Sequence, residues 1–215
     1  MGAYYSATRF LANAVLGALS GWSVSGVDHV PRRGGMIIAS NHISFWDPPL
    51  IGAALAREMH FLAKEELFAT PLLGPLIRSW NAIPIRRGTA DLSGLARAIE
   101  TLKRGGALLM FPEGSRMRDG ELHPARPGLG LMAVSADVPI VPCYISGSNR
   151  PGRWWYRGAR VRMTFGTPRG WRDYAGPEAE SPPGRALYQR IGQTAMTDIA
   201  GLKREQERMA SRGAA

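Results

Sequence analysis

Short apolar runs alternate along the chain with longer segments whose apolar residues recur at helical spacing. Runs of this length predict buried strands, and helical spacing predicts helices with one apolar face. The predicted strands cover residues 36–39, 59–63, 83–85, 107–111, 140–145 and 161–165. The predicted helices cover residues 50–57, 72–80, 92–103, 129–136 and 184–209. This alternation predicts an α/β fold in which helices flank a mostly parallel mixed sheet.

The length of the chain limits the number of domains. A chain of 215 residues is long enough for one well-buried domain and short for two. No internal repeat or long linker divides the sequence. We therefore predict a single domain over residues 24–210, preceded by an N-terminal helix over residues 1–23.

The N-terminal helix is expected to be amphipathic. Its apolar residues follow helical spacing over residues 10–22, but Asn13 interrupts them, and a membrane-spanning helix needs about 18 or more apolar residues in a row. Residues 1–5 also lack the positive charge with which a signal peptide begins. We therefore expect a helix that lies in the membrane interface. The alternative is a helix that packs on its own domain.

Three polar clusters each follow a predicted strand directly. Asn41 and His42 follow the first strand, Arg86 and Arg87 follow the third, and residues 113–116 follow the fourth. In open α/β sheets, ligands bind outside the carboxyl ends of the strands. If these strands run parallel, the three clusters face one crevice.

His42 and Asp47 are a candidate base and the carboxylate that positions it. Pro48 and Pro49 disfavour a helix through Asp47, so a turn can fold its carboxylate onto the imidazole. There the carboxylate would accept the Nδ1 proton and leave Nε2 free as a base. Alternatively, Asp47 only caps the helix that Pro48 begins. The chain has no Gly-x-Ser-x-Gly elbow, so Ser44 is expected to brace the turn and not to act as a nucleophile.

The two other polar clusters are candidate groups for binding a substrate. In the loop over residues 111–116, Glu113 could accept hydrogen bonds from hydroxyl groups and Arg116 could grip a phosphate. A surface turn with a local ion pair is the alternative for this loop. For Arg86 and Arg87, the alternative is a pair of solvated side chains at a strand end.

The charge of the chain is strongly positive. There are 27 Lys and Arg against 17 Asp and Glu, which gives +10. Most of the basic residues are arginines, whose planar donor fork suits phosphate-bearing partners, although a codon bias would give the same composition. Residues 138–172 contain several arginines, no acidic residue, and the aromatic residues Trp154, Trp155, Tyr156 and Trp171. Such a stretch suits a lipid headgroup interface, a nucleotide-bearing cofactor or single-stranded nucleic acid.

Other residues argue against alternative chemistry. Cys143 is the only cysteine and lies in a predicted buried strand, which indicates a core residue and a reducing compartment. His29, His60 and His123 have no partner at zinc-ligand spacing, so no metal site is predicted. Residues 128–133 match Gly-x-Gly-x-x-Ala but follow no strand, which predicts a helix start and not a nicotinamide site.

Taken together, the polar blocks resemble those of the lysophospholipid acyltransferase family, typified by PlsC-like 1-acylglycerol-3-phosphate acyltransferases. The resemblance rests on the pattern Asn41-His42-x-Ser44-x-x-Asp47 followed by Phe-Pro-Glu-Gly-x-Arg over residues 111–116. Residues 63–67, 83–88 and 138–142 resemble further blocks of the family, in the same order along the chain. The resemblance covers residues 36–146.

The resemblance implies transfer of a fatty acyl group from acyl-CoA or acyl-carrier protein to the hydroxyl of a lysophospholipid. The favoured acceptor is 1-acylglycerol-3-phosphate, which would give phosphatidate. His42 would be the base, with Asp47 holding the imidazolium and with Asn41 and Ser44 in support. The residues expected to bind the acceptor are Arg87 and Arg116 at its phosphate, with Glu113 and Gly114 at its glycerol portion. No cofactor beyond the acyl donor and no nucleic acid partner are expected. The expected location is the cytoplasmic face of the cell membrane, at an anionic surface, with peripheral or monotopic attachment.

Two positions depart from the family pattern. Arg86 stands where an acidic residue commonly precedes the arginine, and Met117 stands where a serine commonly follows Arg116. Another lysophospholipid or a lyso-aminolipid therefore remains open as the acceptor. The competing class is a basic module that binds membranes or nucleic acid, which would bind in a salt-dependent way independently of His42.

Overall fold

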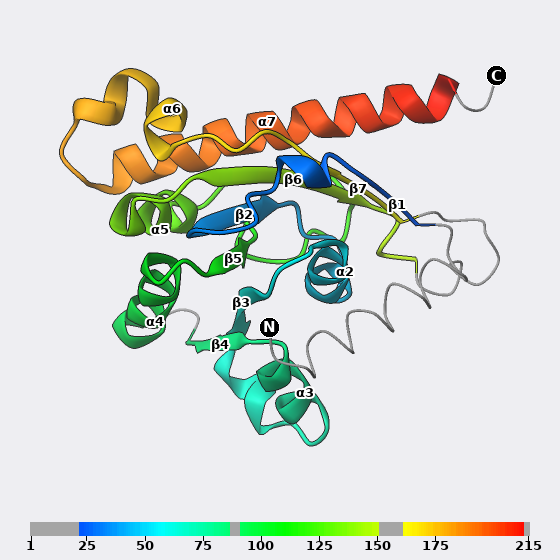
Figure 1. Ribbon diagram of the computed structural model, residues 1–215, viewed down its shortest axis with the longest axis horizontal. Helices are drawn as coiled ribbons and strands as arrows, with labels where there is room; N and C mark the ends of the chain where they lie inside the picture. Colours follow the sequence, from blue (N-terminus) through cyan, green and yellow to red (C-terminus); the bar gives the residue numbers. More distant parts are fainter. Residues whose placement is uncertain (1–21, 87–90, 151–160, 213–215) are drawn as a thin grey trace.

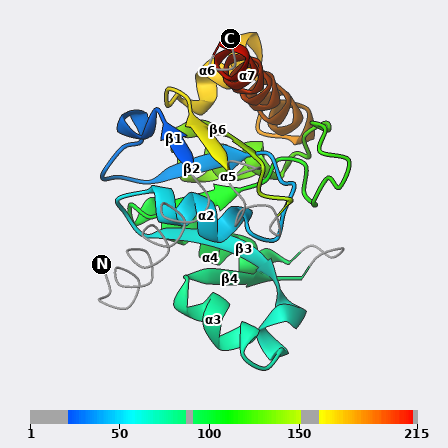
Figure 2. The same ribbon diagram turned by 90° about the vertical axis from the view of Figure 1, so that its right-hand side faces the viewer.

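The computed structural model describes residues 22–86, 91–150 and 161–212. Nearly all of the expected N-terminal helix and the whole of Arg87 lie outside these residues. Within them, the chain folds into a twisted sheet with helices on both faces, and the long helix α7 and the short helix α3 lie at opposite ends of the molecule (Figures 1 and 2).

The described strands form one seven-stranded sheet in the order β1-β7-β6-β2-β5-β3-β4. They are β1 (Ser23–Ser25), β2 (Met36–Ser40), β3 (Met59–Lys64), β4 (Ala82–Ile85), β5 (Ala107–Met110), β6 (Ile140–Ser146) and β7 (Arg162–Phe165). β6, β2, β5, β3 and β4 run parallel, β7 is antiparallel to β6, and β1 is parallel to β7. The predicted mostly parallel mixed sheet is confirmed. The apolar pattern does not predict β1, because three residues are too few to show a period.

The helices fall close to the predicted segments. They are α2 (Asp47–Ala54), α3 (Leu73–Ser79), α4 (Leu92–Lys103), α5 (Gly128–Ala136), α6 (Trp171–Ala175) and α7 (Arg185–Arg212), with 3-10 helices η1 (Val27–His29), η2 (Glu65–Ala69) and η4 (Gly176–Glu180). α2 begins and ends three residues earlier than predicted. The expectation that Pro48 and Pro49 keep Asp47 out of the helix is wrong, since the first turn needs no backbone N–H from proline.

Two apolar cores separate the sheet from its helices. Along β2, Met36 and Ile38 face the core that contains side chains of α2, η2 and α3. Ile37 and Ala39 face the other core, which contains side chains of α4, α5, α6 and α7. This alternation follows from the period of two in a strand, and it explains why β2 is apolar at every position except its last.

The topology brings two of the polar clusters together at one edge. β2 and β5 are neighbours, with Ala39 opposite Met110, so the segments that follow them leave the sheet side by side. β4 is separated from β5 by β3. Arg86 therefore lies at the same edge but about two strand spacings, or ~10 Å, further along it.

Candidate active site

His42 and Asp47 form a hydrogen-bonded pair just beyond the carboxyl end of β2. Nδ1 of His42 lies 2.8 Å from Oδ2 of Asp47. An ionised carboxylate only accepts hydrogen bonds, so Nδ1 carries the proton and Nε2 keeps its lone pair. The side chain of His42 is 12% exposed, whereas that of Asp47 is fully buried. The predicted contact is formed, and Nε2 has no hydrogen-bond partner among the described residues.

The carboxylate of Asp47 is held at both of its oxygens. Oδ2 also accepts the backbone N–H groups of Ile43 and Ser44, each at 2.8 Å. Oδ1 accepts the hydroxyl of Ser148 at 2.6 Å. The helix cap considered as the alternative role of Asp47 is not formed, because the N-cap of α2 is Trp46 and no side chain caps this helix. The carboxylate thus stabilises the loop that carries His42 and does not cap the helix.

The imidazole of His42 is supported from the neighbouring loop, after β5. The ring of Phe111 stacks on it, with centroids 3.8 Å apart and an angle of 13° between the planes. The backbone N–H of Met117 donates to the carbonyl of His42 at 2.7 Å. Together with the bond to Asp47, these contacts restrain both the orientation of the ring and the backbone that bears it.

The carboxylate of Glu113 holds the backbone of two loop segments and so acts as a brace for the loop of His42. Its Oε2 accepts the backbone N–H of His42 at 2.9 Å, and its Oε1 accepts that of His123 at 3.1 Å. The side chain is nearly fully buried, and this desolvation raises the pKa of the carboxyl group, although both backbone donors oppose the shift. Because both oxygens already hold backbone groups, the geometry favours support of the loop over the expected contact with glycerol.

Asn41 and Ser44 both make the local bonds of supporting residues. The amide of Asn41 donates to the carbonyl of Ile145 at 3.0 Å and accepts its N–H at 2.8 Å, which ties the end of β2 to β6. The hydroxyl of Ser44 accepts the backbone N–H of Trp46 at 3.2 Å inside the turn between the histidine and the aspartate. Both side chains are buried, so neither faces a reactant.

Arg116 and Gly114 lie in the loop that follows β5. The guanidinium of Arg116 lies over the ring of Phe45, 4.6 Å from its centroid, and it has no carboxylate partner among the described residues. Gly114 has φ +76°, and a Cβ there would lie 2.6 Å from the side chain of Arg126. The loop therefore needs glycine at this position both for its backbone conformation and for the packing of Arg126.

Arg86 forms an ion pair with Glu65 and does not contact the His42–Asp47 pair, which we call the dyad. Its Nε lies 2.6 Å from Oε2 of Glu65, and its backbone N–H donates to Asp91, the N-cap residue of α4. The positive charge that departs from the family pattern is therefore balanced locally. The described part of the chain does not include Arg87, so its expected contact with phosphate stays a prediction.

Part of the arginine-rich stretch over residues 138–172 is bound to acidic residues of the protein itself. Trp171 is buried and donates to Asp137 at 2.7 Å, and Arg172 pairs with the same carboxylate at 3.2 Å. Arg169 pairs with Asp198 at 2.9 Å. Acidic residues from outside the stretch thus neutralise part of its positive charge. Residues 151–160 lie outside the described residues.

Cys143 is a core residue, as predicted. It is fully buried in β6, and this burial raises the pKa of its thiol to about 12. A neutral thiol is a poor nucleophile, so Cys143 is an inert small side chain at neutral pH. The structure also shows no group of three or more potential metal ligands within residues 22–86, 91–150 and 161–212.

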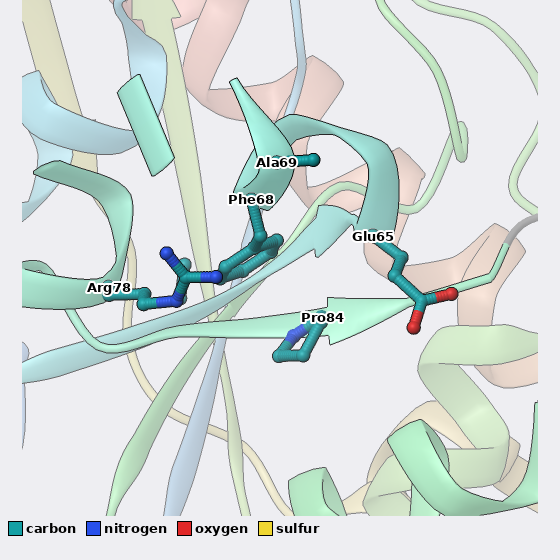
Figure 3. Close-up of a pocket in the computed structure, with 6 residues that line it drawn as sticks. Glu65, Phe68, Ala69, Arg78 and Pro84 are labelled. Atoms are coloured by element: carbon teal, nitrogen blue, oxygen red, sulfur yellow. The ribbon is translucent and has the colours of Figure 1, made fainter. Parts of the chain in front are cut away.

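A pocket of about 440 Å³ lies beside the edge strand β4 (Figure 3). Its lining residues are Glu65, Phe68, Ala69, Arg78, Ala82 and Pro84. The guanidinium of Arg78 lies 5.4 Å from the ring centroid of Phe68 at one end of the pocket, and Glu65 stands at the other. No residue of the dyad or of the loop over residues 111–117 lines this pocket, so it is not the place where His42 meets a reactant.

Two contacts of the site are not predicted by the sequence. The stacking of Phe111 on His42 joins residues 69 positions apart, and Ser148 reaches Asp47 across 101 positions. Phe111 directly precedes the Pro-Glu-Gly block. The motif therefore places Phe111 in the loop after the strand, but it does not predict that the ring stacks on His42. Ser148 follows Gly147 after β6 and carries no pattern of its own. Only the strand order, which places β6 and β5 on either side of β2, reveals both contacts.

The chain is similar in sequence and in fold to known proteins. The crystal structure of the 1-acyl-sn-glycerophosphate acyltransferase PlsC from Thermotoga maritima matches with a TM-score of 0.70 and 26% identity, over 93% of this chain and 79% of that chain. The 1-acyl-sn-glycerol-3-phosphate acyltransferase of Bacillus subtilis is 28% identical over 190 residues, which are 85% of this chain and 94% of that protein. The lyso-ornithine lipid O-acyltransferase of Pseudomonas aeruginosa is 38% identical over 112 residues, or 52% of this chain and 43% of that protein.

The fold and the site define an α/β acyltransferase, with a His–Asp pair at the carboxyl edge of the sheet. The family model described as Acyltransferase matches residues 22–146, which is more than half of the chain. The chain belongs to the Acyltransferase family, and the predicted resemblance is confirmed. Its relatives named above differ in their acceptor lipid, so family membership alone leaves the acceptor open.

Proposed function

We propose that this protein transfers a fatty acyl group from acyl-CoA or acyl-carrier protein to the free hydroxyl of 1-acylglycerol-3-phosphate. The observation that carries the proposal is the pair formed by His42 and Asp47, whose contact through Nδ1 leaves Nε2 without a partner in the described residues. A positioned base with a free lone pair is the group that activation of a hydroxyl requires.

The proposed reaction proceeds in one direct transfer. Nε2 of His42 takes the proton of the acceptor hydroxyl while its oxygen attacks the thioester carbonyl carbon. The tetrahedral intermediate then collapses, the carbon–sulfur bond breaks, and the leaving sulfur takes the proton back from the imidazolium. Asp47 stabilises that imidazolium through Nδ1. A positioned general base contributes about 10²- to 10⁴-fold to such a reaction.

The charge near the dyad favours a phosphate-bearing acceptor. Arg116 offers a guanidinium that no carboxylate neutralises among the described residues, and it stacks on Phe45, three positions from His42. A guanidinium of this kind is suited to bind an anionic group of the acceptor. Arg87 is proposed as a second ligand of the phosphate, and Gly114 as a position where the backbone approaches the acceptor.

The acceptor is proposed to come from an anionic membrane surface at the cytoplasmic face of the cell. The net charge of +10 supports attraction to such a surface. Exposed apolar residues support contact with lipid, namely Phe45 and Trp46 in the loop of His42, Leu76 in α3 and Leu72 just before it. Within the described ranges, no helix is both long enough and apolar enough to cross a bilayer. The expected interfacial helix over residues 1–23 stays a prediction.

Release of the CoA thiol is the direct test of this function. Palmitoyl-CoA and 1-acylglycerol-3-phosphate are supplied to the wild-type protein, to His42→Ala and to His29→Ala, and the lipid product is identified by mass. His29 follows the outermost strand β1 and contacts the carbonyl of Phe165 in β7, so its variant controls for loss of a histidine. We expect phosphatidate from the wild type and from His29→Ala, and a loss of at least about 10²-fold in His42→Ala.

The result also separates the alternatives. Equal turnover by His42→Ala and the wild type would refute the role of His42. Turnover with lyso-ornithine lipid but not with 1-acylglycerol-3-phosphate would replace the acceptor and keep the mechanism. If acyl-CoA is not used, the same assay with acyl-carrier protein decides the donor, because the free thiol of the carrier is detected in the same way.

A further inference from the structure

Ser148 stands out because it is a fully buried polar residue that no motif of the chain includes. It lies two residues beyond the end of β6, after Gly147, whose φ of +78° turns the chain at the end of the strand. Its hydroxyl contacts Oδ1 of Asp47 at 2.6 Å. The partner of its hydroxyl is thus the carboxylate of the proposed catalytic pair and not a backbone group of its own loop.

The direction of this hydrogen bond follows from its chemistry. The ionised carboxylate of Asp47 can only accept, so the hydroxyl of Ser148 donates its proton to Oδ1. A separation of 2.6 Å is the length of a charge-assisted O–H···O⁻ bond, which is stronger than a bond between neutral groups. The other oxygen, Oδ2, is engaged by His42 and by two backbone N–H groups.

Ser148 is the one partner of Oδ1 among the described residues, since the other contacts of the carboxylate all reach Oδ2. With both oxygens engaged, rotation of the carboxylate about its Cβ–Cγ bond would break hydrogen bonds on each side. This restraint keeps Oδ2 in line with Nδ1 of His42, which in turn fixes the tautomer that leaves Nε2 as the base. Without the hydroxyl, Oδ1 would be buried and unsatisfied, a costly state for a charged group.

We propose that Ser148 is a positioning residue of the acyl transfer, which acts on His42 through Asp47. This inference rests on the proposed function for its effect on turnover, and it extends the pair to a chain of three side chains. The third member follows β6, the strand that neighbours β2 on the side away from β5. Ser148 does not touch the reactants, because it is fully buried beneath the carboxylate.

Ser146 offers a matched control in the same segment. Its hydroxyl donates to Oε1 of Gln206 at 2.5 Å, so Ser146→Ala also removes a short hydrogen bond between side chains, but one that does not involve Asp47. The single thiol of Cys143 reports on the core near both serines, because it reacts with thiol reagents only when β6 is exposed. Labelling of this thiol therefore shows whether each variant keeps its fold.

The first measurement is the split between kcat and KM in the CoA-release assay. We expect Ser148→Ala to lower kcat by about 10- to 100-fold, the loss of one hydrogen bond to a charged group, with KM for the acceptor little changed. Ser148→Thr keeps the hydroxyl and should recover most of kcat. Ser146→Ala should retain the kcat of the wild type. Wild-type kcat in Ser148→Ala, or an equal loss in the two alanine variants, would overturn the proposal.

The second measurement does not depend on turnover. In ¹⁵N-histidine-labelled protein, the Nδ1–H proton of His42 is expected far downfield in the wild type and in Ser146→Ala, and shifted or lost through exchange in Ser148→Ala. An unchanged resonance in Ser148→Ala would refute the inference even if the enzyme uses a different acceptor. If the wild type shows the resonance but turns over no lysolipid, the proposed function fails and the positioning of His42 is still decided. If Ser148→Thr does not fold, the comparison of the two alanine variants decides alone.

Discussion

The backbone N–H of His42 donates to the buried carboxylate of Glu113 at 2.9 Å. Glu113 belongs to the loop after β5 and His42 to the loop after β2. This hydrogen bond, like the one from Met117 to the carbonyl of His42, therefore joins the two segments that form the site. The other oxygen of Glu113 holds the N–H of His123, further along its own loop. The glutamate expected to touch the acceptor therefore acts in this structure as a brace for the base.

Removal of this brace should affect both stability and activity. Glu113→Ala leaves two N–H groups without their acceptor in a buried region, so we expect the free energy of unfolding in urea to fall by about 1–3 kcal/mol, with a lower kcat. Glu121→Ala is the control, since Glu121 is an exposed residue of the same loop whose ion-pair partner among the described residues is Lys203. Equal stability of Glu113→Ala and Glu121→Ala would contradict the role of a brace.

The same carboxyl group should make stability depend on pH in a defined direction. Burial raises the pKa of Glu113 in the folded protein above its ordinary value of 4.5. Between these two values the folded state binds more protons than the unfolded state, so the contribution of Glu113 to stability falls as the pH rises through this window. Below pH 4.5 that contribution is fully present.

Glu113→Gln provides the comparison, because its amide does not titrate. The difference in unfolding free energy between the wild type and Glu113→Gln should shift against the wild type as the pH rises from 4.5. Urea titrations at intervals of half a pH unit measure this difference. A difference that moves in favour of the wild type would show that the two backbone donors outweigh the desolvation of the carboxylate.

The sequence predicts the strands and helices well because their apolar runs are long and their periods differ. It also predicts that Asp47 folds back onto His42, since the two residues are close in the chain. The contacts made by Ser148 and Phe111 depend on which strands become neighbours, and no local pattern carries that information. The two backbone contacts of Glu113 are not predicted for the same reason, because only the strand order places an N–H group against each of its oxygens. Its expected contact with the acceptor stays a prediction.

Arg116 should act on acceptor binding and not on the chemical step. Replacement by alanine removes the guanidinium over Phe45, and we expect KM for 1-acylglycerol-3-phosphate to rise by about 10- to 100-fold with a small change in kcat. Arg118→Ala, two positions away, should leave KM unchanged. Steady-state kinetics with varied acceptor give both constants. A fall in kcat at constant KM would place Arg116 in the chemistry of transfer instead.

Leu72 should contribute to binding of the lipid surface. It is 88% exposed, lies just before α3 and has φ +65°, a strained conformation that costs a leucine about 1–3 kcal/mol. Leu72→Gly removes both the apolar side chain and this strain. We therefore expect weaker co-sedimentation with vesicles of phosphatidylglycerol and phosphatidylcholine, without a lower melting temperature.

Met209 provides the control for this experiment, because it is also exposed but lies on α7, at the other end of the molecule from α3 (Figure 1). Met209→Ser should bind the vesicles as the wild type does. A second series at high salt separates the two sources of affinity, since salt screens the attraction of the basic protein to anionic lipid but not the insertion of a leucine. If Leu72→Gly binds as tightly as Met209→Ser at both salt concentrations, the apolar surface near α3 does not contact lipid, and electrostatic attraction alone accounts for any binding that remains.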